Sequence, residues 1–109
     1  MVMDNKMKIA IPTNDGENIF PKMLGKAKEF HLYEIKNYEI RFLEKRKNPY
    51  ENTLQPLKTL DVYEIISDCD VIFSHKIGNK GVKRLEEREM KLFFGNGKIS
   101  EALKRYFGG

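Results

Sequence analysis

The chain has 109 residues, of which 40% are hydrophobic and 33% charged, so its composition fits one globular domain over residues 1–109 and not a disordered chain. Its net charge of +4 comes from 20 basic and 16 acidic residues that are mixed along the sequence, which argues against a nucleic-acid-binding surface. The single cysteine, Cys69, excludes an internal disulfide and a cysteine-pair zinc site and favours the reducing cytoplasm.

The first half of the chain predicts three strands. Lys8–Pro12 is apolar and stops at a proline, after which the loop 13–18 is rich in turn-forming residues. Glu29–Ile35 and Glu39–Lys45 alternate between apolar and polar residues on either side of a short turn, which predicts a hairpin. The alternation places Phe30 and Leu32 on one face and His31, Tyr33 and Ile35 on the other.

A helix and a central strand are predicted next. The helix runs from about Gln55 to Asp68, because a proline is tolerated in its first turn and Thr53 or Asn52 could cap it. Asp70–Ser74 is a short, continuous apolar run bounded by polar residues, as expected for a parallel strand buried on both faces. The apolar stripe of the helix would consist of Leu57, Leu60, Ile65 and Ile66.

The last third of the chain predicts two helices around one strand. Residues 78–89 form a short amphipathic helix with Val82 and Leu85 inward, and Lys91–Phe94 form a further buried strand. A closing helix is the clearest element, and Gly108-Gly109 end it. Its apolar residues follow helical spacing at Ile99, Ala102, Leu103, Tyr106 and Phe107.

The order strand, strand, strand, helix, strand, helix, strand, helix predicts an α/β fold with a mixed five-stranded sheet and helices on its faces. Right-handed crossovers would place Asp70–Ser74 beside Lys8–Pro12. Ligands of such sheets usually lie outside the carboxyl ends of the strands. The loops 13–18, 74–81 and 95–98 should therefore meet at one edge of the sheet.

The segment Ser74–Gly81, SHKIGNKG, could bind an anion at this edge. Gly78 and Gly81 would let the backbone approach a ligand, and the following helix offers free N–H groups and a favourable dipole. Lys76 and Lys80 add positive charge, and His75 could donate a hydrogen bond or ligate a metal. The alternative is an ordinary strand-to-helix turn with solvated lysines.

A second candidate segment is the bend at residues 21–30. Met23 could be a soft metal ligand, although filling a gap in the core is the commoner role of methionine. Lys26 could contact an anion. His31 lies in the middle of a predicted strand, where a half-buried structural role is expected.

The sequence contains no recognisable catalytic or chelating set. Cys69 precedes the strand that His75 follows, and five strand residues span roughly 17 Å, so the two side chains should not share a metal. No preformed zinc or iron–sulfur site and no Ser–His–Asp set can be assembled. A metal-dependent nuclease would need carboxylates at an edge that carries lysines instead.

Membrane association is not expected either. No apolar run approaches the roughly 20 residues that span a bilayer. The N-terminal residues lack the pattern of an export signal. We expect a cytoplasmic protein that binds neither membranes nor nucleic acids.

Several segments in order resemble the dinitrogenase iron–molybdenum cofactor biosynthesis family, which is related to nitrogenase cofactor carriers. The resemblance runs from Lys8 to Phe107 through KIAIPTND, MLGKAKEFHLYEI, NPY, CDVIFSHKIGNKGVKRLEE and LFFGNGKISEALKRYF. It implies a ribonuclease-H-like α/β fold. It also implies a non-enzymatic role in holding and passing on an anionic iron–sulfur or iron–molybdenum cluster.

The chain departs from the family pattern at three places. Family members typically carry His-Phe-Gly-Arg-Ala at the bend, where this chain has Met23 in place of the histidine and Lys26 in place of the arginine. His75-Lys76 stand where Gly-Gly is frequent, and Lys98 replaces a threonine before the last helix. His75 could compensate for the missing histidine if the two loops face the same sheet edge.

These observations lead to a binding domain for an anionic ligand, with a metal–sulfur cluster as one candidate. His75, and with it Met23, would be direct ligands, His75 being the expected metal ligand. A homodimer that shares one cluster is also allowed, because a single chain offers few ligands. The alternative is an interaction or scaffold module that has lost cluster binding, for which we expect an exposed apolar patch. The expected cofactor-binding residues are Met23, Lys26, His75, Lys76, Gly78 and Lys80.

Overall fold

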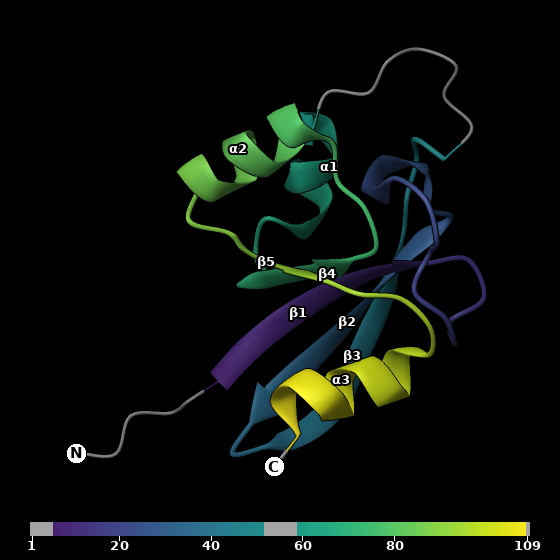
Figure 1. Ribbon diagram of the computed structural model, residues 1–109, viewed down its shortest axis with the longest axis vertical. Helices are drawn as coiled ribbons and strands as arrows, with labels where there is room; N and C mark the ends of the chain where they lie inside the picture. The colour runs from purple at the N-terminus through teal and green to yellow at the C-terminus, as the bar shows by residue number, and fades with distance from the viewer. Residues whose placement is uncertain (1–5, 52–58, 109) are drawn as a thin grey trace.

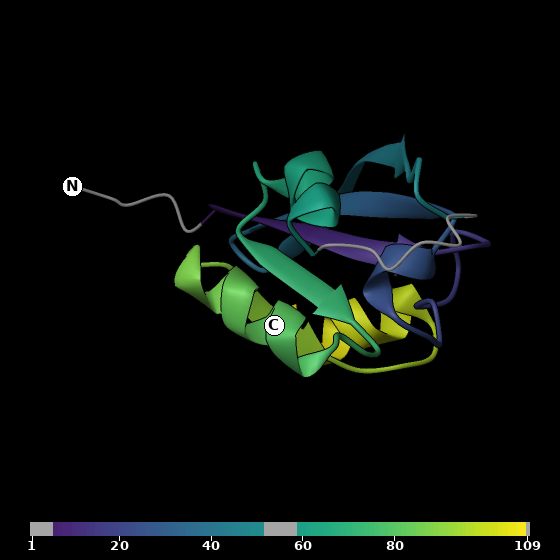
Figure 2. The same cartoon turned by 90° about the horizontal axis from the view of Figure 1, so that it is seen from above.

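The computed structural model describes residues 6–51 and 59–108, which form a single five-stranded sheet with helices on both faces. Figures 1 and 2 show α1 and α2 side by side over β4, and Figure 1 shows α3 on the other side of the sheet. The elements are β1 (Lys6–Thr13), the 3-10 turn η1 (Leu24–Lys26), β2 (Glu29–Lys36), β3 (Glu39–Lys47), α1 (Thr59–Ile66), β4 (Val71–Ser74), α2 (Asn79–Glu87), β5 (Lys91–Phe94) and α3 (Ile99–Phe107).

The strands lie in the order β3-β2-β1-β4-β5. β1 pairs antiparallel with β2 and parallel with β4, and β4 pairs parallel with β5. The predicted mixed sheet is therefore confirmed, and β4 lies beside β1 as the crossover rule requires. The β2–β3 hairpin is also confirmed. Its turn residues Asn37 (φ 51°) and Tyr38 (φ 67°) have positive φ angles, as a two-residue hairpin turn demands.

Two apolar layers hold the helices against the sheet. The alternation of β2 divides its side chains between these layers as predicted, because successive strand residues point to opposite faces. The layer under α1 and α2 contains Ala10, Phe30, Leu32, Val62, Ile66, Ile72 and Leu85. The layer under α3 contains Ile9, Ile11, Ile35, Val71, Phe73, Ile99, Ala102 and Leu103. All four residues of β4 are buried, which confirms the predicted central strand.

Two predicted helices differ from the structure in detail. α1 ends at Ile66 and not at Asp68, because the N–H of Cys69 donates to the Ile66 carbonyl oxygen (3.0 Å) and the chain turns into β4. The predicted first part of this helix, with Leu57, lies outside the described residues. In α2, Leu85 is buried but Val82 is only half-buried.

The prediction that Lys91–Phe94 is a buried strand was wrong in its burial, although the bounds are correct. β5 is the last strand of the sheet, so one of its edges has no neighbouring strand within the described chain, and Phe94 is 46% exposed. Tyr106 of α3, predicted to be inward, is 49% exposed, so that prediction was wrong. Gly108 ends α3 with φ −76°, so the helix stops without a left-handed glycine. None of the helices in the described part of the chain is long and apolar enough to cross a membrane.

Candidate functional site

The loops at the carboxyl ends of β1, β4 and β5 form one continuous edge of the molecule, which we call the rim. The N–H of Ile19 donates to the carbonyl oxygen of Gly97 (2.9 Å), and the N–H of Ile99 donates to that of Glu17 (2.8 Å). The N–H of Gly95 donates to the carbonyl oxygen of Ser74 (3.1 Å). These bonds join the three loops that the sheet topology predicted to meet.

The bend and the loop after β4 are also joined, through their backbones. Met23 and Lys76 form a parallel bridge, and the N–H of Leu24 donates to the Lys76 carbonyl oxygen (3.0 Å). The side chain of Met23 crosses the same gap, because a Cβ placed on Gly78 would lie 3.2 Å from the Met23 Cε. Two segments about 50 residues apart in sequence therefore form one surface, as expected for a shared site.

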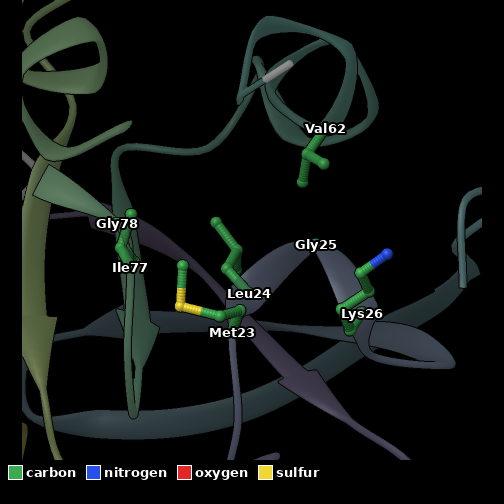
Figure 3. A pocket seen from close by; sticks show the side chains of 7 residues that line it. All are labelled: Met23, Leu24, Gly25, Lys26, Val62, Ile77 and Gly78. Atoms are coloured by element: carbon green, nitrogen blue, oxygen red, sulfur yellow. The ribbon is translucent and has the colours of Figure 1, made fainter. Parts of the chain in front are cut away.

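A small pocket of about 190 Å³ opens at this junction (Figure 3). Figure 3 shows Met23 and Lys26 on either side of Leu24, with Val62 of α1 facing the bend. Met23 is 39% exposed, so the alternative that it fills a gap in the core is wrong. The pocket combines an apolar wall with one cationic side chain; its lining residues are Met23, Leu24, Gly25, Lys26, Val62, Ile77 and Gly78.

The other predicted site residues flank Ile77 and Gly78 of the pocket in the sequence. His75, Lys76 and Lys80 are exposed, in the loop after β4 and in the first turn of α2. Gly78 is the N-cap residue of α2 and provides no capping side chain, and no acidic residue occupies the first turn. The N–H groups and the positive end of the helix dipole therefore face the rim without a negative side chain of that turn beside them. Gly81 is buried within α2, so its expected approach to a ligand is not supported.

The charge order along α2 is unusual for an isolated helix. Lys80 and Lys83 lie among its first five residues, Arg84 follows in the last turn, and Glu86 and Glu87 end the helix. A helix is stabilised by acidic residues at its N-terminus and basic residues at its C-terminus, so this arrangement opposes the dipole. It concentrates positive potential where α2 meets the rim.

A buried asparagine holds the bend in place, and sequence reasoning missed it. The side-chain amide of Asn48 donates to the carbonyl oxygens of Gly25 (2.9 Å) and Ala27 (2.8 Å). Its own oxygen accepts from the N–H of Tyr50 (3.0 Å), and the residue is 0% exposed. Asn48 begins the NPY segment, one of the segments that carry the family resemblance. The short polar amide fits this role because it can satisfy several backbone groups at once.

The carboxylate of Asp15, the first after β1, accepts hydrogen bonds within the turn that follows the strand. Hydrogen bonds from the Asn18 side chain (2.9 Å) and from the N–H groups of Asn18 and Glu17 (both 2.8 Å) hold the pKa of Asp15 well below its usual range. These bonds use the lone pairs that a cation would need. The carboxylate cluster required by a nuclease site is therefore not supported here.

His31 has the half-buried structural position that was expected. Its side chain is 12% exposed, and its Nε2 lies 2.5 Å from a Glu29 carboxylate oxygen. The ring packs against Phe42, with centroids 5.3 Å apart, and it fills the space beneath Gly16. His75 is thus the histidine at the junction of the bend and the loop after β4.

The described residues contain no group of three or more His, Cys, Asp or Glu side chains that could hold a metal ion. Cys69 is buried at the opposite end of β4 from His75, and burial raises the pKa of its thiol to about 11. A bare metal ion therefore lacks a chelating set in these parts of the chain. The donor set fits an anion that carries its own ligands better, because it offers cations, N–H groups, one imidazole and one thioether.

Known structures of similar shape cover almost the whole chain. The crystal structure of PH0822 matches with a TM-score of 0.76 and 19% identity, over 93% of this chain and 90% of that one. The apo form of the orange protein from Desulfovibrio gigas matches with a TM-score of 0.72 and 18% identity, over 92% and 86% of the two chains. TM1290 from Thermotoga, of the DUF35 family, matches with a TM-score of 0.65 and 16% identity, again over 92% and 86%.

Such low identities establish the common fold and nothing about ligands. Among curated proteins, none is significantly similar in sequence. The family model described as dinitrogenase iron–molybdenum cofactor matches residues 5–109. The chain therefore belongs to the dinitrogenase iron–molybdenum cofactor family.

Proposed function

We propose that this protein is a cytoplasmic, non-enzymatic binding domain that holds an anionic ligand at the rim. The family makes an iron–sulfur or iron–molybdenum cluster the first candidate for that ligand, as cargo to be passed on. The strand order β3-β2-β1-β4-β5, in which β2 runs antiparallel to the other four strands, supports assigning the fold to the ribonuclease-H-like group.

One observation carries the proposal: the backbone bridge between Met23 and Lys76. It brings the bend, with Met23 and Lys26, against the loop that carries His75 and Lys76. Lys80 and the N–H groups after Gly78 complete a cationic surface around the small apolar pocket. Lysine ammonium groups and a helix N-terminus together favour an anion over a cation.

The cluster would bind mainly by charge and packing. Its sulfides would accept hydrogen bonds from the α2 N–H groups and from the lysines, while the apolar wall of the pocket would exclude water from one side. His75 would supply the imidazole that family members carry at the position of Met23. The thioether of Met23 would be a second, softer ligand.

Anaerobic reconstitution with iron, sulfide and molybdate tests the proposal. The purified protein should gain visible absorbance, and His75→Ala should remove most of it. His31→Gln is the matched control, since it changes the other histidine of the chain, and it should retain the absorbance. Circular dichroism of each variant separates loss of binding from loss of fold. Equal absorbance in the wild-type and His75→Ala proteins would contradict the role of His75.

A scaffold module that has lost cluster binding is the second candidate. Two observations favour it: Met23 replaces the usual histidine, and several large apolar side chains are exposed, among them Phe42 (49%) and Phe94 (46%). This candidate predicts that the protein acquires no metal during reconstitution and that substitutions at the rim leave its interactions unchanged. Metal analysis of protein purified without oxygen distinguishes the two candidates.

A further inference from the structure

The two edges of the sheet differ in how they are protected. β3 carries alternating charges, including Glu39, Arg41 and Lys45, and a β-bulge disturbs its pairing with β2. Charged side chains and bulges are common devices that prevent one sheet edge from pairing with another. β5 has neither: after Lys91 its residues are Leu92, Phe93 and Phe94, and they are half-buried or exposed.

We propose that two copies of this chain pair through their β5 strands, antiparallel and around a two-fold axis. The backbone supports this geometry. The N–H groups of Lys91 and Gly95 donate inward, to Asp70 and Ser74 beside β4, each at 3.1 Å. Because strand residues alternate, the N–H and C=O groups of Leu92 and Phe94 are directed to the open edge. They are the groups that a second strand would use.

The side chains select one register, centred on Phe93. In this register the backbones of Leu92 and the partner's Phe94 form two N–H···O=C hydrogen bonds. The two-fold axis repeats the same pair between Phe94 and the partner's Leu92. Phe93 then lies opposite its own copy in a non-hydrogen-bonded pair, where side chains approach closely. Phe93 already belongs to an aromatic cluster with Tyr106 (6.2 Å) and Phe107 (5.0 Å), which the partner's ring would extend.

This register also keeps like side chains together across the axis. Leu92 and Phe94 lie on the α2 face of the sheet, because Leu92 packs in the layer under α1 and α2 and strand residues alternate. Each apolar side chain therefore meets an apolar side chain of the partner. Lys91 lies opposite the partner's Gly95, which leaves its ammonium group in solvent.

In the same arrangement, the charges on α2 of one copy complement the charges on α2 of the partner. Val82 and Glu86 of α2 flank the groove beside β5, so a partner's α2 would lie next to this helix. Antiparallel pairing places the basic half of one α2, with Lys83, beside the acidic half of the other, with Glu86. The charge order that opposes the dipole of an isolated helix would be compensated between copies.

The interface is separate from the proposed ligand site. An antiparallel pair places the two rims at opposite ends of the joined sheet, so each copy keeps its own site. Formation of the dimer therefore does not depend on cluster binding. It differs from a dimer that shares one cluster.

Sedimentation equilibrium over a dilution series of about a hundredfold tests the interface. The wild-type chain should show a concentration-dependent dimer, and Phe94→Lys should weaken it by about tenfold or more. Phe42→Lys is the matched control, because Phe42 is an equally exposed aromatic residue on the opposite edge strand, and it should leave the dimer unchanged. Circular dichroism verifies that each variant is folded.

Two further measurements make the test specific to this register. Glu86→Lys should weaken the dimer, and adding Lys83→Glu in the same chain should restore it. Hydrogen exchange at the amides of Leu92 and Phe94 should slow as the protein concentration rises. A wild-type chain that is monomeric throughout the series, or a dimer that Phe94→Lys does not weaken, would overturn the proposal.

Discussion

Arg46 and Asp68 form a two-pronged ion pair that ties the edge strand β3 to the end of α1. The guanidinium donates from Nη1 to Oδ1 (2.6 Å) and from Nη2 to Oδ2 (2.9 Å). Nη1 also donates to the carbonyl oxygen of Ile65 (2.8 Å), one of the last carbonyls of α1. A single side chain thus satisfies a helix terminus and a carboxylate, which only the planar fork of arginine can do with this geometry.

Replacing Arg46 should therefore destabilise the fold without affecting the rim. We expect Arg46→Ala to lower the free energy of unfolding by about 1–2 kcal/mol, and Arg46→Lys to recover only part of the loss. Urea denaturation measures both. The control is Arg41→Ala, since Arg41 is 73% exposed and lies 3.8 Å from Glu34; its effect should be below about 0.5 kcal/mol. Equal losses in Arg46→Ala and Arg41→Ala would contradict the bridging role.

The same pair should make stability depend on acid pH. Hydrogen bonds from Arg46 and then Lys8 hold the pKa of Asp68 well below its usual range. A carboxyl group whose pKa is lowered by folding stabilises the protein above its unfolded pKa of about 4, and this contribution is lost as the pH falls toward the folded pKa.

In Asp68→Asn the loss of stability between about pH 6 and pH 3 should be smaller than in the wild type. We expect a difference of about 0.5–1 kcal/mol, because Asp68 is half-exposed and solvent screens the pair. Urea denaturation at the two pH values measures it. Asp15 also has a lowered pKa, but it is unchanged in the variant and so cancels in the comparison. An unchanged pH dependence would show that the pair contributes little in solution.

Asn48 should be the most sensitive polar position of the bend. Asn48→Ala leaves the carbonyl oxygens of Gly25 and Ala27 without their buried donor, so we expect a loss of about 2–3 kcal/mol in the free energy of unfolding. The exposed Asn96 offers a control, and Asn96→Ala should change stability by less than about 0.5 kcal/mol. A small effect of Asn48→Ala would mean that the bend is held by its backbone bridge to Lys76 instead.

Much of the fold could be predicted from local patterns. The alternation of Glu29–Lys36 determined both faces of β2, and the apolar run Val71–Ser74 determined a central strand, because side-chain periodicity reports burial directly. The edge position of β5 could not be predicted in this way. Its residues are as apolar as those of a buried strand, and only the order of the strands shows that nothing in the described chain covers one side.

The candidate site was predictable in position more than in detail. The rule that ligands lie at the carboxyl ends of α/β sheets predicted that the loops 13–18, 74–81 and 95–98 meet, and the bend at residues 21–30 was expected to join them only if it faced the same edge. The role of Asn48 was not predictable, since its partners Gly25 and Ala27 are more than 20 residues away. The surface position of Met23 also depends on the bridge to Lys76, a contact between distant segments that no local pattern encodes.

Restoring the family histidine should strengthen ligand binding if the proposed function is correct. Met23→His would place an imidazole beside the loop of His75, because Met23 is bridged to Lys76. We expect cluster occupancy after anaerobic reconstitution to rise, with an affinity gain of about tenfold. Visible absorbance and metal analysis measure the change.

Met23→Leu is the matched variant, because it keeps the apolar contact with Gly78 and removes the sulfur. It should bind less cluster than the wild type. If Met23→His and Met23→Leu bind equally, residue 23 is not a ligand, and the cations of the rim must account for any binding.

Two glycines with the same backbone conformation should respond differently to alanine. Gly16 (φ +78°) and Gly97 (φ +84°) both have positive φ angles, which cost any other residue about 1 kcal/mol. A Cβ on Gly97 would meet no described atom within 4 Å, whereas a Cβ on Gly16 would lie 2.9 Å from His31 Cε1. Glu29 and Phe42 hold that ring, so it cannot move away freely.

We therefore expect Gly97→Ala to lower the free energy of unfolding by about 1 kcal/mol and Gly16→Ala by about 2–3 kcal/mol. The additional loss of unfolding free energy at Gly16 should disappear when His31 is also replaced by serine, because the smaller side chain leaves room for the methyl group. Thermal unfolding of the four single and double variants measures this coupling. Equal losses of stability at the two glycines would mean that the His31 ring moves aside for the methyl group. The ring would then give only weak support to the loop after β1.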